Sequence, residues 1–404
     1  MARSFWFLVF LVGIAWADEW EGKVFCGYQG WFRCEGDGGK VGWRHYGGPN
    51  GPTPEQLGIE IWPAVDELPA SLRRPTPFRH RDGKVAEVFS SLDPEVTRLH
   101  FRWMREYGVD AAFLQRFATE TRDPVMRRTL DQVLTQVDSA ATAEGRQWAL
   151  MYDTSGLPSG PMEVLKSDLA RLLETSKWDP HGESYLKIGG KPVVATWGIG
   201  FGDRQTDFAE WQNWVDHLHD KGFAVMLGVP YYWRTLDRDA VGDARLHEVL
   251  ARADVISPWA VGRLGTPDDA ERLGREVVAK DVAWCREKGV RYLPVLFPGF
   301  SWHHLMRSRG QKAEFDAIPR LGGRFLWSQA VAAKKAGSDA VYLAMFDEMD
   351  EGTALMKFDP DPPLGAPFLE EGGVPKDRYL RVAGAIGGWL RNERSEEWPS
   401  FPDR

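Results

Sequence analysis

Eight short apolar runs alternate with longer polar segments along this 404-residue chain, and this alternation limits what the chain can fold into. The runs are rich in β-branched and aromatic residues, and the segments between them have the period of amphipathic helices. From the second run onward, successive runs begin roughly 30 to 50 residues apart, as one strand, one helix and two loops require. The pattern predicts an α/β fold, a single (β/α)8 TIM barrel. A doubly wound open sheet is the alternative.

The expected elements can be given by range. Strands are expected at Val24–Phe32, Ala111–Phe117, Trp148–Asp153, Pro192–Trp197, Ala224–Pro230, Val255–Trp259, Tyr292–Phe297 and Ala340–Phe346. Helices are expected at Pro94–Tyr107, Pro124–Glu144, Met162–Thr175, Asp207–Lys221, Asp243–Ala251, Pro267–Lys288, Gly323–Ala336 and Lys376–Leu390. Two long insertions, Arg33 to Leu92 and Gly299 to Leu321, follow the first and seventh strands, so we expect both at the carboxyl ends of the strands, where active sites of this fold gather.

The N-terminus has the pattern of a secretory signal. Arg3 precedes an apolar run from Phe5 to Trp16, and Ala15-Trp16-Ala17 offers a small-residue cleavage site. We therefore expect residues 1–17 to be a signal peptide, residues 18–404 to form the barrel domain, and the protein to be secreted or periplasmic. No later segment reaches about 18 uninterrupted apolar residues, so no membrane span is expected.

Composition and charge exclude several classes of protein. Hydrophobic residues make up 43% and charged residues 27% of the chain, which excludes disordered, collagenous and small disulfide-rich proteins. A net charge of −8 without a long Lys/Arg run argues against nucleic acid as a partner. Cys26, Cys34 and Cys285 have no metal-ligand spacing; a Cys26–Cys34 bridge and a buried free Cys26 thiol both remain open. We expect a monomer with no metal and no cofactor.

Aromatic residues are abundant, with 19 Trp, 10 Tyr and 21 Phe. Aromatic rings stack on the flat apolar faces of sugars, so an oligosaccharide or polysaccharide is the expected substrate; the alternative is that the rings fill the core. Polar and aromatic residues also follow the expected strands. The candidate substrate-binding residues are Tyr28, Gln29, Trp31, Trp43, Gln115, Arg116, Tyr152, Asp153, Trp197, Tyr231, Tyr232, Trp233, Trp259, Trp302, His303, His304, Asp347 and Asp350.

Several of these candidates have a simpler structural interpretation. Asp153 is also suited to cap a helix, and Arg116 to pair with an acidic loop instead of binding an anionic group. His303 and His304 have no third ligand at a suitable spacing, so they do not indicate a zinc site.

The eighth strand ends in four acids within five residues: Asp347, Glu348, Asp350 and Glu351. Carboxylates grouped in a partly buried pocket raise at least one pKa, so one group can stay protonated as an acid while another is ionised as a base. Glycosidic bond cleavage uses such a pair. A solvated acidic loop and a carboxylate cation site are the alternatives, although the spacing is not that of a Ca²⁺ hand.

This acidic segment resembles a known motif. Phe346-Asp347-Glu348-Met349-Asp350-Glu351-Gly352-Thr353 is similar to the Phe-Asn-Glu-Trp-His-Glu-Gly-Thr motif of glycoside hydrolase family 99, the endo-α-mannosidases and endo-α-mannanases. Further similar elements, in the same order, are Tyr28-Gln29-Gly30-Trp31, Trp43-Arg44-His45-Tyr46, Phe89-Ser90-Ser91-Leu92-Asp93, His100 and Tyr107-Gly108-Val109-Asp110. The likeness extends to the family 71 α-glucanases, which carry an Asp-x-x-Glu pair on the equivalent strand.

The resemblance implies a retaining α-glycoside hydrolase without metal or organic cofactor. Glu348 would deprotonate the sugar 2-hydroxyl, which attacks the anomeric carbon through an epoxide-like intermediate, and Glu351 would act as acid and then base. The family's Asn, Trp and His are replaced here by Asp347, Met349 and Asp350. A mannan-like α-glycan is the expected substrate. The alternatives are an α-glucan, an arabinose- or xylose-containing glycan, and a carbohydrate-binding barrel without catalysis.

Overall fold

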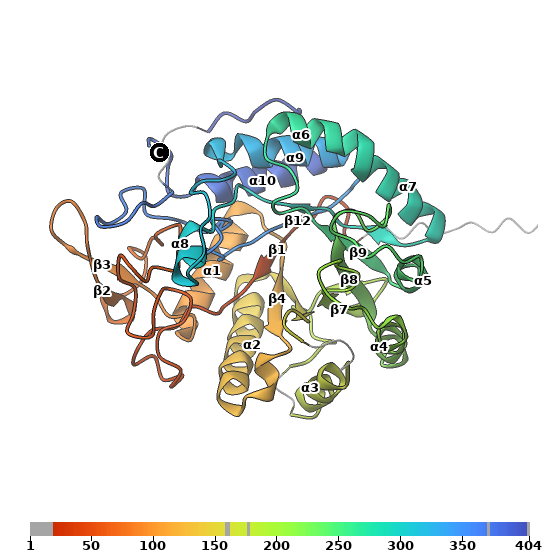
Figure 1. Cartoon of the computed structure of the whole chain (residues 1–404), viewed down its shortest axis with the longest axis horizontal. Coiled ribbons are helices and arrows are strands. Elements are labelled where there is room, and N and C mark those ends of the chain that lie inside the picture. The colour runs from red at the N-terminus through yellow and green to blue at the C-terminus, as the bar shows by residue number, and fades with distance from the viewer. Residues whose placement is uncertain (1–18, 158–161, 176–177, 370–371, 402–404) are drawn as a thin grey trace, which may run out of the picture.

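A computed structural model describes residues 19–157, 162–175, 178–369 and 372–401, so the expected signal peptide lies outside the described residues (Figure 1). Parallel strands curl into one sheet. In chain order they are β1 Val24–Tyr28, β4 Ala111–Phe117, β5 Gln147–Asp153, β7 Lys191–Trp197, β8 Ala224–Pro230, β9 Val255–Trp259, β10 Arg291–Tyr292, β11 Val295–Leu296 and β12 Val341–Leu343. β10 pairs with β9 and β11 pairs with β12, so these two short pieces of one segment close the sheet. The fold is the predicted (β/α)8 barrel.

Helices surround the sheet (Figure 1). The α-helices are α1 Pro94–Tyr107, α2 Pro124–Glu144, α3 Met162–Glu174, α4 Phe208–Asp220, α5 Arg245–Leu250, α6 Pro267–Leu273, α7 Ala279–Lys288, α8 His303–Ser308, α9 Arg324–Lys335 and α10 Arg378–Leu390. The residues at which the helices begin and end follow from capping by neighbouring side chains and glycines. At α2, the Asp123 carboxylate accepts hydrogen bonds from two backbone N–H groups, and Gly145 ends the helix in the left-handed conformation. The predicted helix Pro267–Lys288 is α6 and α7 joined by a π-helical turn, Gly274–Val278.

The two insertions contain elements that the sequence pattern does not predict. The first holds an antiparallel hairpin of β2 Arg74–Arg79 and β3 Val85–Val88, and the second holds α8. A further short strand, β6 Lys187–Ile188, pairs antiparallel with β7. The sequence of β2 contains two prolines, which normally argue against a strand and are tolerated here because the hairpin has only two strands, so both are edges.

The barrel interior is tightly packed. Gly228 on β8 lies directly against the indole ring of Trp197, where a Cβ atom would meet that ring at 1.8 Å. Glycine therefore lets the Trp197 ring lie across the neighbouring strand. Cys26, Cys34 and Cys285 are all buried free thiols, so the Cys26–Cys34 bridge is wrong and the buried-thiol alternative is right. In the described ranges, no helix is both long and apolar enough to cross a bilayer.

Candidate active site

Asp347 fixes the acidic loop to the end of the first barrel strand. Its carboxylate accepts hydrogen bonds from the backbone N–H groups of Gln29 at 2.7 Å and Gly30 at 2.8 Å. Burial raises its pKa to about 7, against the lowering effect of these two bonds. Asp347, predicted to bind substrate, is fully buried and joins two loops of the site.

Glu348 is buried and held on both carboxylate oxygens. Gln29 Nε2 donates to Glu348 Oε1 at 3.0 Å, and Thr353 Oγ1 donates to Oε2 at 3.2 Å. Burial raises the pKa of Glu348 well above its usual value, and the charges of Glu351 and Asp350 add to this effect. The carboxyl group is thus fixed in direction and favours proton uptake.

Glu351, three residues later, is the more open of the two glutamates. Its backbone oxygen accepts a hydrogen bond from the Ser301 N–H at 3.0 Å, while no described residue donates one to its carboxylate. Burial raises its pKa to about 7, the Asp350 charge raises it further, and Arg309 lowers it. A carboxyl that is half protonated near neutral pH and free of protein partners suits proton exchange with a substrate.

Asp350 binds a residue that sequence reasoning did not assign to the site. His45 Nδ1 lies 3.1 Å from Asp350 Oδ2, and the His45 ring stacks on Trp31 with centroids 3.9 Å apart. Trp31 stacks in turn on Phe117, the last residue of β4. The only sequence signal for His45 is its place in the Trp43-Arg44-His45-Tyr46 element.

Glu60, from the first insertion, is a second site residue that the sequence analysis missed. Its fully buried carboxylate accepts hydrogen bonds from Ser301 Oγ at 2.7 Å and from the His304 N–H. Its own N–H donates to the Met349 oxygen at 2.9 Å. Glu60 therefore connects both insertions to the acidic loop, and Ser301 links it to Glu351. An acid inside the apolar run Leu57-Gly58-Ile59-Glu60-Ile61-Trp62 was the available signal.

We expect Glu60→Ala to destabilise the fold and to lower activity. The change leaves the Ser301 hydroxyl and the His304 N–H buried without an acceptor, at a cost of about 1–3 kcal/mol each. Glu60→Gln, which keeps one acceptor oxygen, should lose less than half as much. Urea unfolding measures the free energies; equal stability of wild type and Glu60→Ala would show that Glu60 does not join the loops.

Other predicted residues lie at the strand ends or on the second insertion. Gln115 Nε2 donates to Asp153 Oδ2, and the Trp197 and Trp259 rings pack edge to face with centroids 5.0 Å apart. Trp302 is 39% exposed, although most large apolar side chains here are buried. These residues come from β4, β5, β7, β9 and the second insertion, as the barrel topology predicts.

Four predicted residues are placed in the core instead. The fully buried side chains of Tyr28 and Tyr152 bond to His100 and Asp168, and Trp233 packs against Trp284. Arg116 pairs with helix residues instead of the acidic loop: its Nε and Nη2 atoms donate to Asp168 at 2.6 Å and Asp131 at 2.8 Å. These four side chains are predicted substrate contacts that the structure does not bring to the site.

The remaining predicted residues lie on loops or, for His303 and His304, in the first turn of α8. Tyr231 is buried, with its N–H bonded to Asp239, and Tyr232 lies under the Arg238 guanidinium at 4.0 Å. Trp43 packs edge to face on Tyr46. His303 and His304 are anchored on the backbone oxygens of Ala313 and Pro367. The two histidines therefore hold the second insertion in place.

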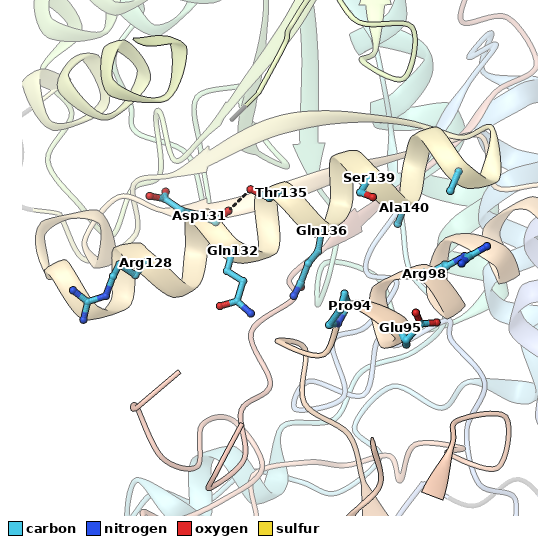
Figure 2. Close-up of a pocket in the computed structure, with 11 residues that line it drawn as sticks. Pro94, Glu95, Arg98, Arg128, Asp131, Gln132, Thr135, Gln136, Ser139 and Ala140 are labelled. Atoms are coloured by element: carbon cyan, nitrogen blue, oxygen red, sulfur yellow. Dashed lines mark hydrogen bonds between the residues drawn. The ribbon is translucent and has the colours of Figure 1, made fainter. Parts of the chain in front are cut away.

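A large groove lies away from these residues, between α1 and α2 (Figure 2). Its volume is about 890 Å³, and Arg98, Arg128, Gln132 and Gln136 are among the residues that line it. Gln132 and Gln136 already donate hydrogen bonds to the Leu92 oxygen. Because the groove lies in the outer helical layer and includes no strand-end residue, we do not assign it to the candidate active site.

Comparison with solved structures finds chains of the same architecture. The GH99 endo-alpha-mannosidase from Bacteroides thetaiotaomicron matches with a TM-score of 0.64 and 13% sequence identity, over 92% of this chain and 98% of that chain. A structure of that enzyme in complex with bis-tris-propane matches over the same shares, with a TM-score of 0.65 and 14% identity. The chain has the fold of these endo-α-mannosidases. The resemblance drawn from the acidic motif is thus confirmed at the level of fold.

No protein-family model matches the sequence, and neither does any curated protein. Among the residues that the structure describes, no three or more His, Cys, Asp or Glu side chains are grouped to hold a metal ion.

Proposed function

We propose that the protein is a glycoside hydrolase that cleaves α-linked glycans. The observation that carries this proposal is the contrast between two neighbouring glutamates: Glu348 is fixed on both oxygens, whereas the Glu351 carboxylate is open, with its pKa raised to about 7. Two carboxyl groups with different environments are what acid–base cleavage of a glycosidic bond requires.

The proposed reaction proceeds with retention at the anomeric carbon. Glu348 accepts the proton of the 2-hydroxyl, whose oxygen bonds to the anomeric carbon while the glycosidic bond breaks and Glu351 donates its proton to the leaving oxygen. Glu351 then takes a proton from water, whose oxygen bonds to the anomeric carbon while the bond between that carbon and the 2-oxygen breaks. The 2-oxygen regains its proton from Glu348. A mannan-like substrate is proposed because of the motif and the fold likeness to endo-α-mannosidases.

A carbohydrate-binding barrel without catalysis is the second candidate, favoured by the exposed aromatic ring of Trp302. Incubation of residues 18–404 with α-mannans, α-glucans and arabinose- or xylose-containing glycans separates the two. We expect released sugars, read by mass spectrometry, from at least one α-glycan. Saturable binding to a glycan without any release would favour the binding barrel and overturn the hydrolase.

The proposal also includes export. The pattern of residues 1–17 supports cleavage before Asp18 and a secreted or periplasmic protein. N-terminal sequencing of the protein from an exporting host should begin at or next to Asp18; an intact N-terminus on cell-retained protein would contradict this.

We expect the rate to fall on the alkaline side of about pH 7. Glu351 must be protonated to act as an acid, and burial together with the Asp350 charge raises its pKa to about 7. Above that pH, kcat/KM should drop about tenfold per pH unit. Asp350→Asn removes the charge and should move this limb to lower pH. A limb that stays in place in the variant would contradict the assignment.

Trp302→Ala should weaken substrate binding more than it slows chemistry. A sugar that stacks on an exposed indole gains about 1 kcal/mol or more, so we expect KM to rise about five- to tenfold with kcat changed less than twofold. Trp302→Phe should retain most of the affinity. An unchanged KM in Trp302→Ala would show that the Trp302 ring does not contact the substrate.

A further inference from the structure

We propose that His45 is a substrate-binding residue, and that Asp350 and Trp31 together hold its ring so that Nε2 receives a sugar hydroxyl beside Glu351. This inference rests on the proposed function and adds a specificity-determining group to the same site. It concerns a pair that the resembling motif does not supply, since Asp350 stands where that motif has His.

Two contacts fix the orientation of the His45 ring. Its face lies on the Trp31 indole with an interplanar angle of 11° and a centroid distance of 3.9 Å. Its edge is fixed by the 3.1 Å contact between Nδ1 and Asp350 Oδ2. A carboxylate oxygen accepts hydrogen bonds, so the tautomer that fits this contact has Nδ1 as the donor. The stack and the hydrogen bond leave the ring little freedom to rotate.

The other edge of the ring is open. The His45 side chain is 26% exposed, and no group among the described residues bonds to Nε2. In the tautomer with the proton on Nδ1, Nε2 presents a lone pair that accepts a hydrogen bond from a hydroxyl. A sugar hydroxyl is the donor that a glycan offers.

Among the described residues, His45 is the hydrogen-bond partner of the Asp350 carboxylate. The Asp350 side chain is 3% exposed; its Oδ2 bonds to His45, and its Oδ1 is buried with no hydrogen-bond partner. Burying a carboxylate with a single hydrogen-bond partner lowers the stability of the fold. A pair that destabilises the fold in this way is expected where it contributes to function. Because Asp350 directly precedes Glu351 and its charge acts on the Glu351 carboxyl, we expect a hydroxyl bound at His45 to belong to a sugar near the proposed acid.

The backbone of His45 is also held in an uncommon conformation. Its φ is +65°, in the left-handed region that residues other than glycine rarely adopt. The neighbouring Arg44 exchanges two backbone hydrogen bonds with Arg33, at 3.1 and 3.2 Å, and these anchor the loop. Strain that a structure maintains in this way is concentrated at functional sites.

A second histidine–aspartate pair provides a matched control. His219 Nε2 lies 3.0 Å from Asp254 Oδ2, and the His219 side chain is 33% exposed. His219 is the penultimate residue of α4, and Asp254 directly precedes β9. This pair therefore lies at the amino-terminal end of the strands, opposite the site. It has the same two side-chain types and a histidine of similar exposure, away from the site, although Asp254 is 34% exposed and Asp350 only 3%.

The test measures glycan affinity in the Glu351→Gln background, which keeps substrate intact. Calorimetric titration with α-mannotetraose and with maltotetraose should give at least one measurable Kd. His45→Ala should raise that Kd about tenfold, Asp350→Leu nearly as much, and the double variant no more than the worse single variant, because both act through one hydrogen bond. His45→Gln, whose amide can replace Nε2, should stay within about threefold, and His219→Ala should have no effect.

The outcomes separate this inference from the proposed function. Binding that His45→Ala retains, with an unchanged melting temperature, would overturn the role of His45 and leave the hydrolase proposal standing. Additive losses in the double variant would overturn the coupling with Asp350. Absence of binding by Glu351→Gln, together with absence of cleavage by the wild type on the whole glycan panel, would overturn both.

Discussion

Replacing Glu351 by Gln should lower kcat/KM by about 10²- to 10⁴-fold, the contribution of a positioned acid–base group. The carboxylate has no hydrogen-bond partner among the described residues, so the change removes a proton donor without breaking a structural contact. Glu348→Gln should cause a loss of the same order, because it removes the proposed base, a carboxylate that Gln29 Nε2 and Thr353 Oγ1 hold in place. Initial rates on the substrate found in the glycan panel measure both.

The folded state should tolerate the change at Glu351. The pKa of this group is raised from 4.5 to about 7, so its ionisation destabilises the fold as the pH rises from about 4.5 to about 7. At pH 8 Glu351→Gln should therefore melt no lower than the wild type. Glu144→Gln, at a buried acid that pairs with Arg105 on the outer helices, should retain full activity. Full activity in Glu351→Gln would contradict the assignment of the acid.

Replacing Arg116 by Met should destabilise the protein by about 3 kcal/mol or more and leave Kd for the glycan unchanged. Arg116 is 1% exposed and bonds to Asp168 and Asp131, and removing one partner of a buried ion pair costs about 3–5 kcal/mol. Arg171 still bonds to both acids, which places the expected loss at the lower end of this range.

The matched change is Arg98→Met, at an exposed arginine that pairs with Glu144. Exposed ion pairs contribute about 1 kcal/mol or less, so its unfolding free energy should stay within that amount of the wild type. Urea unfolding gives the two values. If Arg116→Met left the stability unchanged and weakened glycan binding, Arg116 would be a substrate-binding residue and not a structural one.

The strands and helices of this barrel could be predicted because apolar periodicity reports burial on a sheet or helix face. The residues at which the strands end could be predicted less closely. The first strand was expected to reach Phe32 but ends at Tyr28, because the chain turns at Gly30 with a positive φ and presents two N–H groups to Asp347. That turn depends on a residue more than 300 positions away, which no local pattern contains.

The candidate site was predictable in its motifs and less so in its side chains. The acids of the last strand were identified because a buried strand rarely ends in four carboxylates. Neighbours on one strand point to opposite faces, so Gln115 reaches Asp153 while Arg116 faces the helices, and both had been assigned to the site. His45 and Glu60 come from a long insertion without periodicity, and only the folded chain places them beside the acidic loop.

The most direct test of the central claim is the anomeric configuration of the first product. Proton NMR of the wild type acting on the substrate from the glycan panel, recorded within the first minutes, distinguishes α from β products before they interconvert. The Glu348 and Glu351 pair predicts release of the α-anomer and its loss in Glu351→Gln. Release of the β-anomer, or unchanged release by the variant, would contradict the account.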